Sequence, residues 1–332
     1  MYQPEIYATA LTFMLVSMFC WGSWANTMKL CPSYRFQLFY WDYVGGLILG
    51  TLLWGFTLGS TGSAGAPFLA SLLSAHAPEF LLAALGGVIF NVANLLLVAA
   101  IEVAGLAVAF PVGIGLALVV GAVANYVINP AGNPVLLFSG IALVVVAIVL
   151  DAVACSLREK SRKKAGGKGI LLSLLAGVLM GCFYPFVAKA MSSPATPGPY
   201  AVAFFFAIGV VVCAIPVNYL LMRKPVDGKP AVDFSGYFSA PVRWHLFGIL
   251  GGMIWCTGTL FNFVASGTHF VGPAVSYSLG QGATMVSAAW GVFVWREFAG
   301  TSSRIKKLLA FMFVFFLLGL SAIAAAPLLA AK

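Results

Sequence analysis

Ten uninterrupted apolar segments of about 20 residues constrain this chain more than any other feature of its sequence. An α-helix rises 1.5 Å per residue, so a segment of that length crosses a hydrocarbon core about 30 Å thick. Only 8% of the residues are charged, against roughly 25% in an ordinary soluble domain. The sequence therefore predicts an all-α membrane protein with ten transmembrane helices, and it excludes a soluble enzyme.

The ten expected helices form two groups of five. The first group covers residues 6–28, 36–58, 80–101, 104–128 and 134–156, and the second covers 169–189, 200–222, 244–267, 272–295 and 308–330. We therefore expect a first five-helix unit at residues 1–157, a basic cytoplasmic loop at 158–168 and a second five-helix unit at 169–332.

The positive charges follow a membrane topology. All of the 18 Lys and Arg residues except Lys189 and Lys332 fall in alternate connections between the expected helices. Basic loops stay on the cytoplasmic side of a membrane, so we expect both termini on the opposite side. The formal net charge of +9 then needs no nucleic-acid partner. We expect an integral protein of a plasma membrane, in particular a bacterial inner membrane.

The second half of the sequence repeats the first. LGGVI at 85–89 matches LGGMI at 250–254, and GLAVAFPVGIG at 105–115 matches GPAVSYSLGQG at 272–282. A unit with an odd number of helices enters the membrane from opposite faces in its two copies, so we expect inverted repeats. Such repeats place a solute site near the middle of the bilayer and expose it to each side in turn. The pattern predicts a transporter that works by alternating access.

Signatures of ATP use and of catalysis are lacking. Gly167 and Lys168 do not belong to a phosphate-binding loop, because position 162 holds an arginine where that motif requires glycine. We find no spaced group of His, Cys or carboxylate residues of catalytic kind. We therefore expect no enzymatic activity, no cofactor and no metal, and a solute or ion gradient as the energy source.

Four segments are similar to those of a known family. They are WGSWANTMKL at 21–30, FYWDYVGG at 39–46, GPYAVAFFFAIGVVVCAIPVNYLLMRKP at 198–225 and SAAWGVFVWREF at 287–298. They resemble the ureide permease and glucose/ribose porter branch of the drug/metabolite transporter superfamily. The resemblance implies ten helices, an inverted repeat and secondary transport of a small neutral solute, either a monosaccharide or a ureide or nucleobase. The central loop is about a dozen residues here, whereas plant ureide permeases have a long one, so no role of that loop is inferred.

Polar side chains inside the expected helices are candidates for binding the solute. A polar group in hydrocarbon is costly, so it faces the interior of the bundle or a water-filled path. The favoured residues lie in the middle of the repeat: Asn91, Asn94, Asn262, Tyr277 and Gln281. Amides and phenols donate and accept hydrogen bonds, which suits a neutral solute with hydroxyl or amide groups. The alternative is that they tie helices together.

Aromatic residues complete the expected solute site. Trp21 and Trp24 are three residues apart and share a helical face, where they could stack on a sugar ring or a planar base. Trp255 could do the same from the second half, and Asn26 is the remaining polar candidate. The alternative for the tryptophans is contact with lipid or an interfacial belt.

Asp42 is the one carboxylate that we expect well inside a helix. An ionised carboxylate is costly there, so Asp42 is our candidate for taking up and releasing a proton that couples to solute movement. The alternative is a structural role, in which Asp42 pairs with Lys29 or Arg35 near the start of its helix and benefits from the helix dipole. His245 and His269 have weaker support as proton sites.

Two other classes of protein remain open from the sequence. A facilitative uniporter or channel needs no titratable group, and a multidrug exporter requires a carboxylate in its cavity. The partners that we expect are a small-molecule solute, the lipid bilayer and protons. The sequence does not distinguish a monomer from a homodimer.

Overall fold

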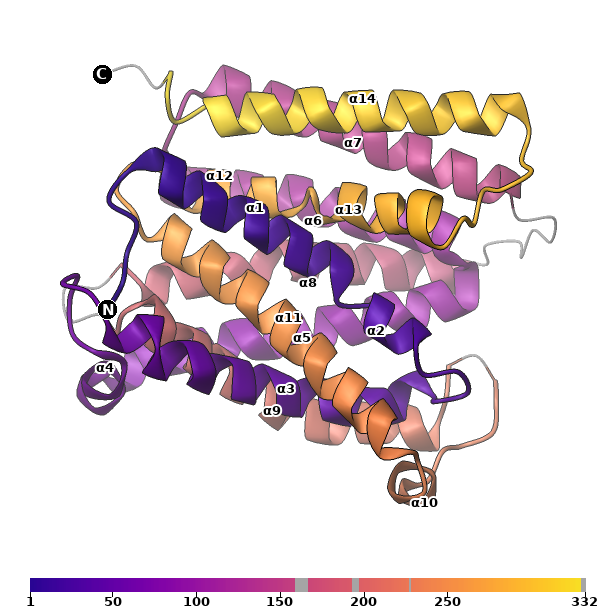
Figure 1. The fold of residues 1–332 in the computed structure, drawn as a ribbon, viewed down its shortest axis with the longest axis horizontal. Coiled ribbons are helices and arrows are strands. Elements are labelled where there is room, and N and C mark those ends of the chain that lie inside the picture. Colours follow the sequence, from indigo (N-terminus) through magenta and orange to yellow (C-terminus); the bar gives the residue numbers. More distant parts are fainter. Residues whose placement is uncertain (159–166, 193–196, 227, 330–332) are drawn as a thin grey trace.

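The chain forms an all-α membrane protein. The computed structural model describes residues 1–158, 167–192, 197–226 and 228–329, and all regular structure within them is helical (Figure 1). The expected basic loop at 158–168 lies mostly outside these residues.

Nine of the ten expected membrane helices are observed as continuous spans in the described residues. They are α1 (Tyr7–Ser23) with its short extension α2 (Asn26–Lys29), α3 (Phe36–Phe56), α5 (Ala77–Ala104), α6 (Leu106–Ile128), α7 (Pro134–Arg158), α8 (Gly167–Ala190), α9 (Pro199–Arg223), α11 (Val242–Ser266) and α14 (Ser303–Ala325). Three short elements lie in the connections: η1 (Leu58–Ser60), α4 (Phe68–Ser74) and α10 (Phe234–Phe238).

The remaining segment, 272–295, is not the single helix that we expected. It consists of α12 (Pro273–Gly280), α13 (Ala283–Ala289) and a π-helical turn, η2 (Trp290–Val294). Tight turns at Gln281 and Gly282 interrupt it, and their N–H groups bond to carbonyls three residues back. A Cβ at Gly282 would clash with Met18 of α1. The expectation of one continuous helix was wrong, because the segment turns at Gln281 and Gly282, where it packs closely on α1.

Helix packing follows the internal repeat. Helix α5 of the first half packs against α8 and α9 of the second half. Helix α11 of the second half packs against α1 and α3 of the first half. These contacts are equivalent if α1, α3 and α5 correspond to α8, α9 and α11. Under the same correspondence α7 pairs with α14, and these two helices lie side by side at one edge of the bundle (Figure 1).

Glycines bring two of these helix pairs to backbone contact. A Cβ at Gly87 of α5 would overlap the Phe206 carbonyl of α9, and one at Gly252 of α11 would overlap the Tyr43 carbonyl of α3. Gly87 and Gly252 are the second glycines of the repeated LGG motif. The repeat thus preserves a place where side chains are absent and helix backbones touch, as in other membrane helix pairs.

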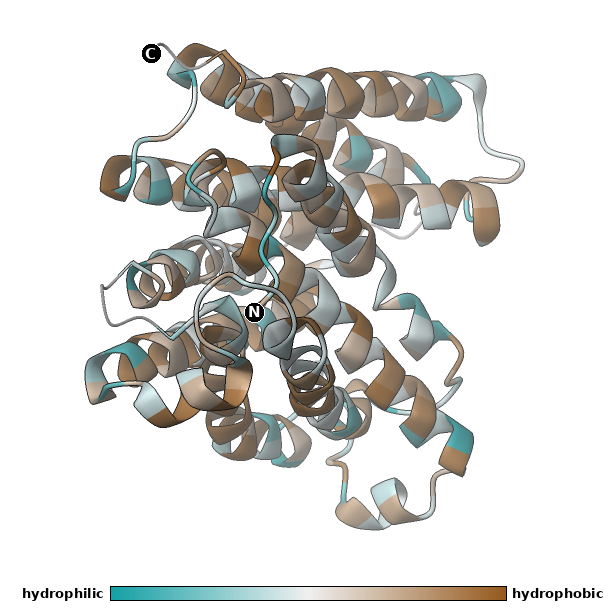
Figure 2. Ribbon diagram, turned by 60° about the vertical axis from the view of Figure 1, so that its left-hand side comes forward, coloured by the Kyte–Doolittle hydropathy of each residue, from teal (hydrophilic) through white to brown (hydrophobic). Residues whose placement is uncertain are grey.

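The two ends of the bundle differ in charge. Hydrophobic residues run along the helices, and many of the hydrophilic ones lie at helix ends and in loops (Figure 2). The N-terminus and the end of α14 lie at one end, and α2, α10 and the end of α7 lie at the other (Figure 1). At this second end, which we call the basic end, Glu297 bridges Lys29 at 2.5 Å and Arg158 at 2.7 Å.

Replacing a contact glycine should destabilise the fold. We expect Gly87→Ala and Gly252→Ala each to lower the free energy of unfolding by about 1–3 kcal/mol, because the added methyl group forces the helix backbones apart. Gly45→Ala on α3 is the matched control, because a Cβ there meets nothing within 4 Å. Thermal melting of the purified protein in detergent measures the effect, and equal melting of all three variants would refute close backbone packing.

The bridge at Glu297 should make stability depend on pH. Burial raises the pKa of the Glu297 carboxyl, but hydrogen bonds and charges from Lys29 and Arg158 outweigh burial and hold the pKa below its ordinary value of 4.5. A lowered pKa in the folded state gives stabilisation that is present above the unfolded-state pKa and is lost as pH falls through the folded-state pKa. Each partly exposed pair contributes about 0.2–1 kcal/mol.

We therefore expect the native protein to lose more stability than Glu297→Gln between about pH 5 and pH 3. Melting temperature as a function of pH is the measurement. Asp233→Asn is the control, because its pair with Arg223 is exposed on both sides and such pairs contribute little. Parallel melting curves for the native protein and Glu297→Gln would contradict the prediction.

Candidate functional site

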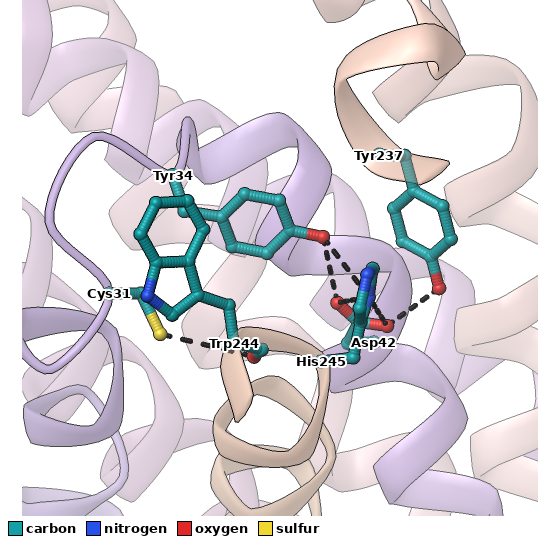
Figure 3. Close-up of polar contacts among 6 residues, drawn as sticks. All are labelled: Cys31, Tyr34, Asp42, Tyr237, Trp244 and His245. Carbon is teal, nitrogen blue, oxygen red and sulfur yellow. Dashed lines mark hydrogen bonds and ion pairs between the residues drawn. The ribbon is translucent and has the colours of Figure 1, made fainter. Parts of the chain in front are cut away.

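Asp42 lies at the centre of a buried polar cluster near the basic end. Its side chain is 3% exposed, and three residues from other segments point to its carboxylate (Figure 3). Tyr34 donates to Oδ2 at 2.9 Å and Tyr237 donates to Oδ1 at 2.6 Å. His245 places Nδ1 3.0 Å from both oxygens. We call these four residues the Asp42 cluster.

The Asp42 cluster joins four segments of the chain. Tyr34 precedes α3, Asp42 is on α3, Tyr237 is on α10 and His245 is in the first turn of α11. Ser33, directly before Tyr34, has a left-handed φ of 72°. Such backbone strain persists only where the surrounding structure imposes it. Here the left-handed turn lies directly before the tyrosine that reaches the carboxylate.

Asp42 does not pair with Lys29 or Arg35, so the alternative in which these residues are its structural partners is wrong. Lys29 pairs with Glu297, and Arg35 lies 3.5 Å from the carbonyl oxygen of Pro230. Sequence reasoning placed His245 among the weaker proton candidates and did not identify Tyr34 or Tyr237. Both tyrosines lie outside the long apolar segments, so a search for polar groups within membrane helices passes over them.

Both tyrosines remain hydrogen-bond donors. Burial raises the pKa of Tyr34, and the charge of Asp42 and its hydrogen bond raise it further. Burial also raises the pKa of Tyr237, followed by the hydrogen bond and charge of Asp42. Neither phenol therefore loses its proton near neutral pH. Each phenol thus keeps a hydrogen that it donates to a carboxylate oxygen of Asp42.

A second group of candidate residues meets in the middle of the bundle. Trp255 of α11 lies among four aromatic rings at centroid distances of 4.5 Å (Phe90), 6.2 Å (Trp21 and Phe206) and 6.4 Å (Tyr43). We call these five residues the central aromatic cluster. Trp255 is 6% exposed, so the alternative of lipid contact is wrong for it.

The tryptophan rings of this cluster are held in place. Trp21 and Trp255 are nearly parallel, with an interplanar angle of 22°. The Trp21 indole donates to the Thr259 hydroxyl at 3.0 Å. A pocket beside Trp255 is lined mostly by apolar groups of α3, α9 and α11, together with Thr51 and Thr259. Trp24 extends the cluster through its ring contact with Tyr43 at 4.8 Å.

Two polar atoms next to this cluster lack hydrogen-bond partners within the described residues. Tyr40 donates to the side-chain oxygen of Asn91 at 2.7 Å and accepts from Asn94 at 3.3 Å. The hydroxyl of Tyr43 and the amide nitrogen of Asn91 are both buried and make no such bond, and Asn91 lies against the Cys213 thiol. Buried polar groups are nearly always paired, so these two are the strongest candidates to meet a solute.

The other amide and phenol candidates are satisfied by the protein itself. Asn262 accepts from Tyr184 at 2.6 Å and donates to the Ser276 carbonyl at 2.9 Å. Tyr277 donates to the Ala117 carbonyl at 3.0 Å. These bonds link α8, α11 and α12, and α12 to α6, which is the tying role that we considered for them.

Asn26 and Gln281 lie apart from these contacts. Asn26 accepts a 2.6 Å bond from the Trp295 indole, and it bonds to the Ser23 carbonyl, so it connects α2 with the segment after η2. Gln281 is half-buried at the break between α12 and α13. The structure thus brings Trp21, Trp24, Trp255, Asn91 and Asn94 together, and places Asn26 nearer the basic end.

The sequence matches a family model described as sugar transport protein over residues 12–326. The chain belongs to this family. Ureide permease 4 of Arabidopsis thaliana is 23% identical over 95% of this chain and 96% of its own. The glucose uptake protein GlcU of Bacillus subtilis is 25% identical over 66% of this chain and 69% of its own. These relatives are transporters, so this family member is a membrane solute transporter and not an enzyme.

A solved structure supports the fold of this family member. A protein of known crystal structure aligns with a TM-score of 0.68 over 98% of this chain and 99% of the other. The two sequences are 14% identical, so the likeness concerns the fold alone.

Proposed function

We propose that this family member transports a monosaccharide by alternating access between two inverted five-helix repeats, with solute movement coupled to protons through Asp42. The basic end faces the cytoplasm and both termini face outward, in keeping with the positive-inside rule. A bacterial inner membrane is the proposed location. The equivalent packing of α5 and α11 against the opposite halves supports the inverted arrangement.

The observation that supports a sugar is the combination found at the central aromatic cluster. The Trp21 and Trp255 rings lie nearly parallel, and the Tyr43 ring, whose hydroxyl is unpartnered among the described residues, contacts Trp255. Asn91 joins this group through its bond with Tyr40, whose ring stacks on Tyr43. These are neutral donors and acceptors, and they match the hydroxyl groups and apolar ring faces of a monosaccharide. A ureide or nucleobase shares hydrogen-bonding groups of this kind, and it is the second candidate.

The other two classes have less support. A multidrug exporter for cations requires an available carboxylate in its cavity, whereas both oxygens of Asp42 accept hydrogen bonds from tyrosines and also contact Nδ1 of His245. A uniporter or channel would leave a carboxylate and imidazole pair without a transport role. Energetic coupling gives that pair a function.

Uptake into proteoliposomes tests the solute class and the coupling together. We expect accumulation of one or more sugars from a radiolabelled panel of glucose, ribose, fucose, allantoin and uracil. With one proton per solute, each unit of inward pH gradient supports up to about tenfold accumulation. Asp42→Asn should lose the stimulation at neutral pH and retain exchange of solute.

Two results would overturn parts of this proposal. Native uptake that ignores the gradient would indicate a uniporter. Accumulation of allantoin or uracil without any sugar would replace the monosaccharide by the second candidate.

Removal of the Tyr43 hydroxyl tests the solute site. In Tyr43→Phe we expect unchanged melting, because the hydroxyl has no partner in the described part of the chain. The KM for solute should rise about two- to tenfold, the loss of one hydrogen bond of 0.5–1.5 kcal/mol. Tyr200→Phe is the control, because that hydroxyl bonds to the Tyr2 carbonyl and its loss should leave KM unchanged. An unaltered KM in Tyr43→Phe would remove Tyr43 from the site.

A further inference from the structure

The Asp42 cluster holds more than one group that can carry a proton. Its four members are Asp42, His245, Tyr34 and Tyr237. Cys31 follows α2 nearby, and Arg243 lies two residues before His245 in the first turn of α11. Under the coupling proposed above, the exchanged proton resides on one of these groups. Their contacts distinguish among them.

The carboxylate of Asp42 is poorly placed to take the proton. It receives hydrogen bonds from Tyr34 on Oδ2 and Tyr237 on Oδ1, and Nδ1 of His245 lies 3.0 Å from each oxygen (Figure 3). Protonating one oxygen would weaken the hydrogen bond that this oxygen accepts from its tyrosine, because a bond to a charged acceptor is stronger than one to a neutral acceptor. Each carboxylate oxygen already accepts such a bond from a phenol.

The phenols and the thiol do not titrate near neutral pH. Burial and the charge of Asp42 raise the pKa of Tyr34 and Tyr237, as described above. Burial raises the pKa of the Cys31 thiol, the charge of Asp42 raises it further, and Arg243 lowers it. These three groups therefore keep their protons throughout the range in which an unperturbed histidine titrates.

His245 has one ring nitrogen committed and one open. Its Nδ1 faces the carboxylate, so we assign the hydrogen of the neutral ring to Nδ1, which leaves the lone pair on Nε2. Nε2 has no hydrogen-bond partner within the described residues, and the side chain is 21% exposed. Because His245 is in the first turn of α11 at the basic end, we expect water at the membrane surface to reach the exposed part of the ring.

We infer that the coupled proton binds to Nε2 of His245, and that Asp42 stays ionised as its counter-ion. This inference rests on the proton coupling in the proposed function and changes the group that carries the proton. Nε2 takes a proton from water to give an imidazolium next to the carboxylate, and returns it to water later. Asp42 is thus a positioning residue for the proton site.

The location of His245 connects the proton to the solute site. Both His245 and Trp255 are on α11, ten residues or about 15 Å apart along the helix. Protonation converts a hydrogen bond between neutral imidazole and Asp42 into an ion pair, which strengthens the attachment of α11 to α3. The same helix contributes Trp255 and Thr259 to the surroundings of the central aromatic cluster.

Stimulation of uptake by an inward proton gradient, measured at outer pH from 5 to 8, tests this inference. His245→Asn is the main variant, because its amide can still donate near the Nδ1 position but cannot take a proton. We expect it to lose gradient stimulation at every pH and to retain solute exchange within about threefold of native. His269→Asn is the matched control at the other end of α11, where the side chain is exposed, and it should behave as native.

Asp42→Asn provides a second test that does not depend on the folding of His245→Asn. Without its counter-ion the imidazole of His245 needs a higher proton concentration to become protonated. Stimulation that is absent at pH 7 should therefore return toward pH 5. Stimulation that persists in His245→Asn, or that never returns in Asp42→Asn while exchange continues, would place the proton on the carboxylate. Absence of stimulation in the native protein would instead overturn the proposed coupling itself.

Discussion

Backbone contact between helices is the constraint on which the rest of this structure depends. Within a bilayer the hydrophobic effect does not drive helices together, so close packing of their surfaces must do so. Gly87 brings α5 against α9, and Gly252 brings α11 against α3. Both contacts lie beside the central aromatic cluster, because Phe206 and Tyr43 supply the carbonyls that the glycines approach. Ring positions in the cluster therefore follow from how closely these backbones meet.

Much of this architecture could be predicted from the sequence, for physical reasons. Nine of ten spans were found because a bilayer demands long apolar helices, and the LGG repeat indicated which helices are equivalent. The break at Gln281 and Gly282 was missed, because hydropathy does not register a turn inside an apolar segment. The partners of Asp42 were missed because Tyr34 and Tyr237 lie in connections, and contacts between distant loops have no periodicity to reveal them.

The sequence could not predict which candidate residues have hydrogen-bond partners within the protein and which do not. Asn91 and Asn262 are both amides in central helices, yet one has an unpartnered nitrogen and the other is bonded through its oxygen and nitrogen. The difference depends on helix rotation, which is fixed by packing with neighbours. Two residues with a left-handed backbone conformation come directly before polar contacts at the basic end. Ser33 precedes Tyr34. Arg296, with a φ of 51°, precedes Glu297.

The glycine contacts also bear on how such a chain could arise. Gly87 lies in the first half of the sequence and its partner helix α9 in the second, and the reverse holds for Gly252 and α3. Neither half can cover its own contact surface. Under the inverted arrangement proposed above, a five-helix ancestor would have needed a second copy in the opposite orientation to bury it. Gene fusion of two such copies would then have fixed their orientation within one chain.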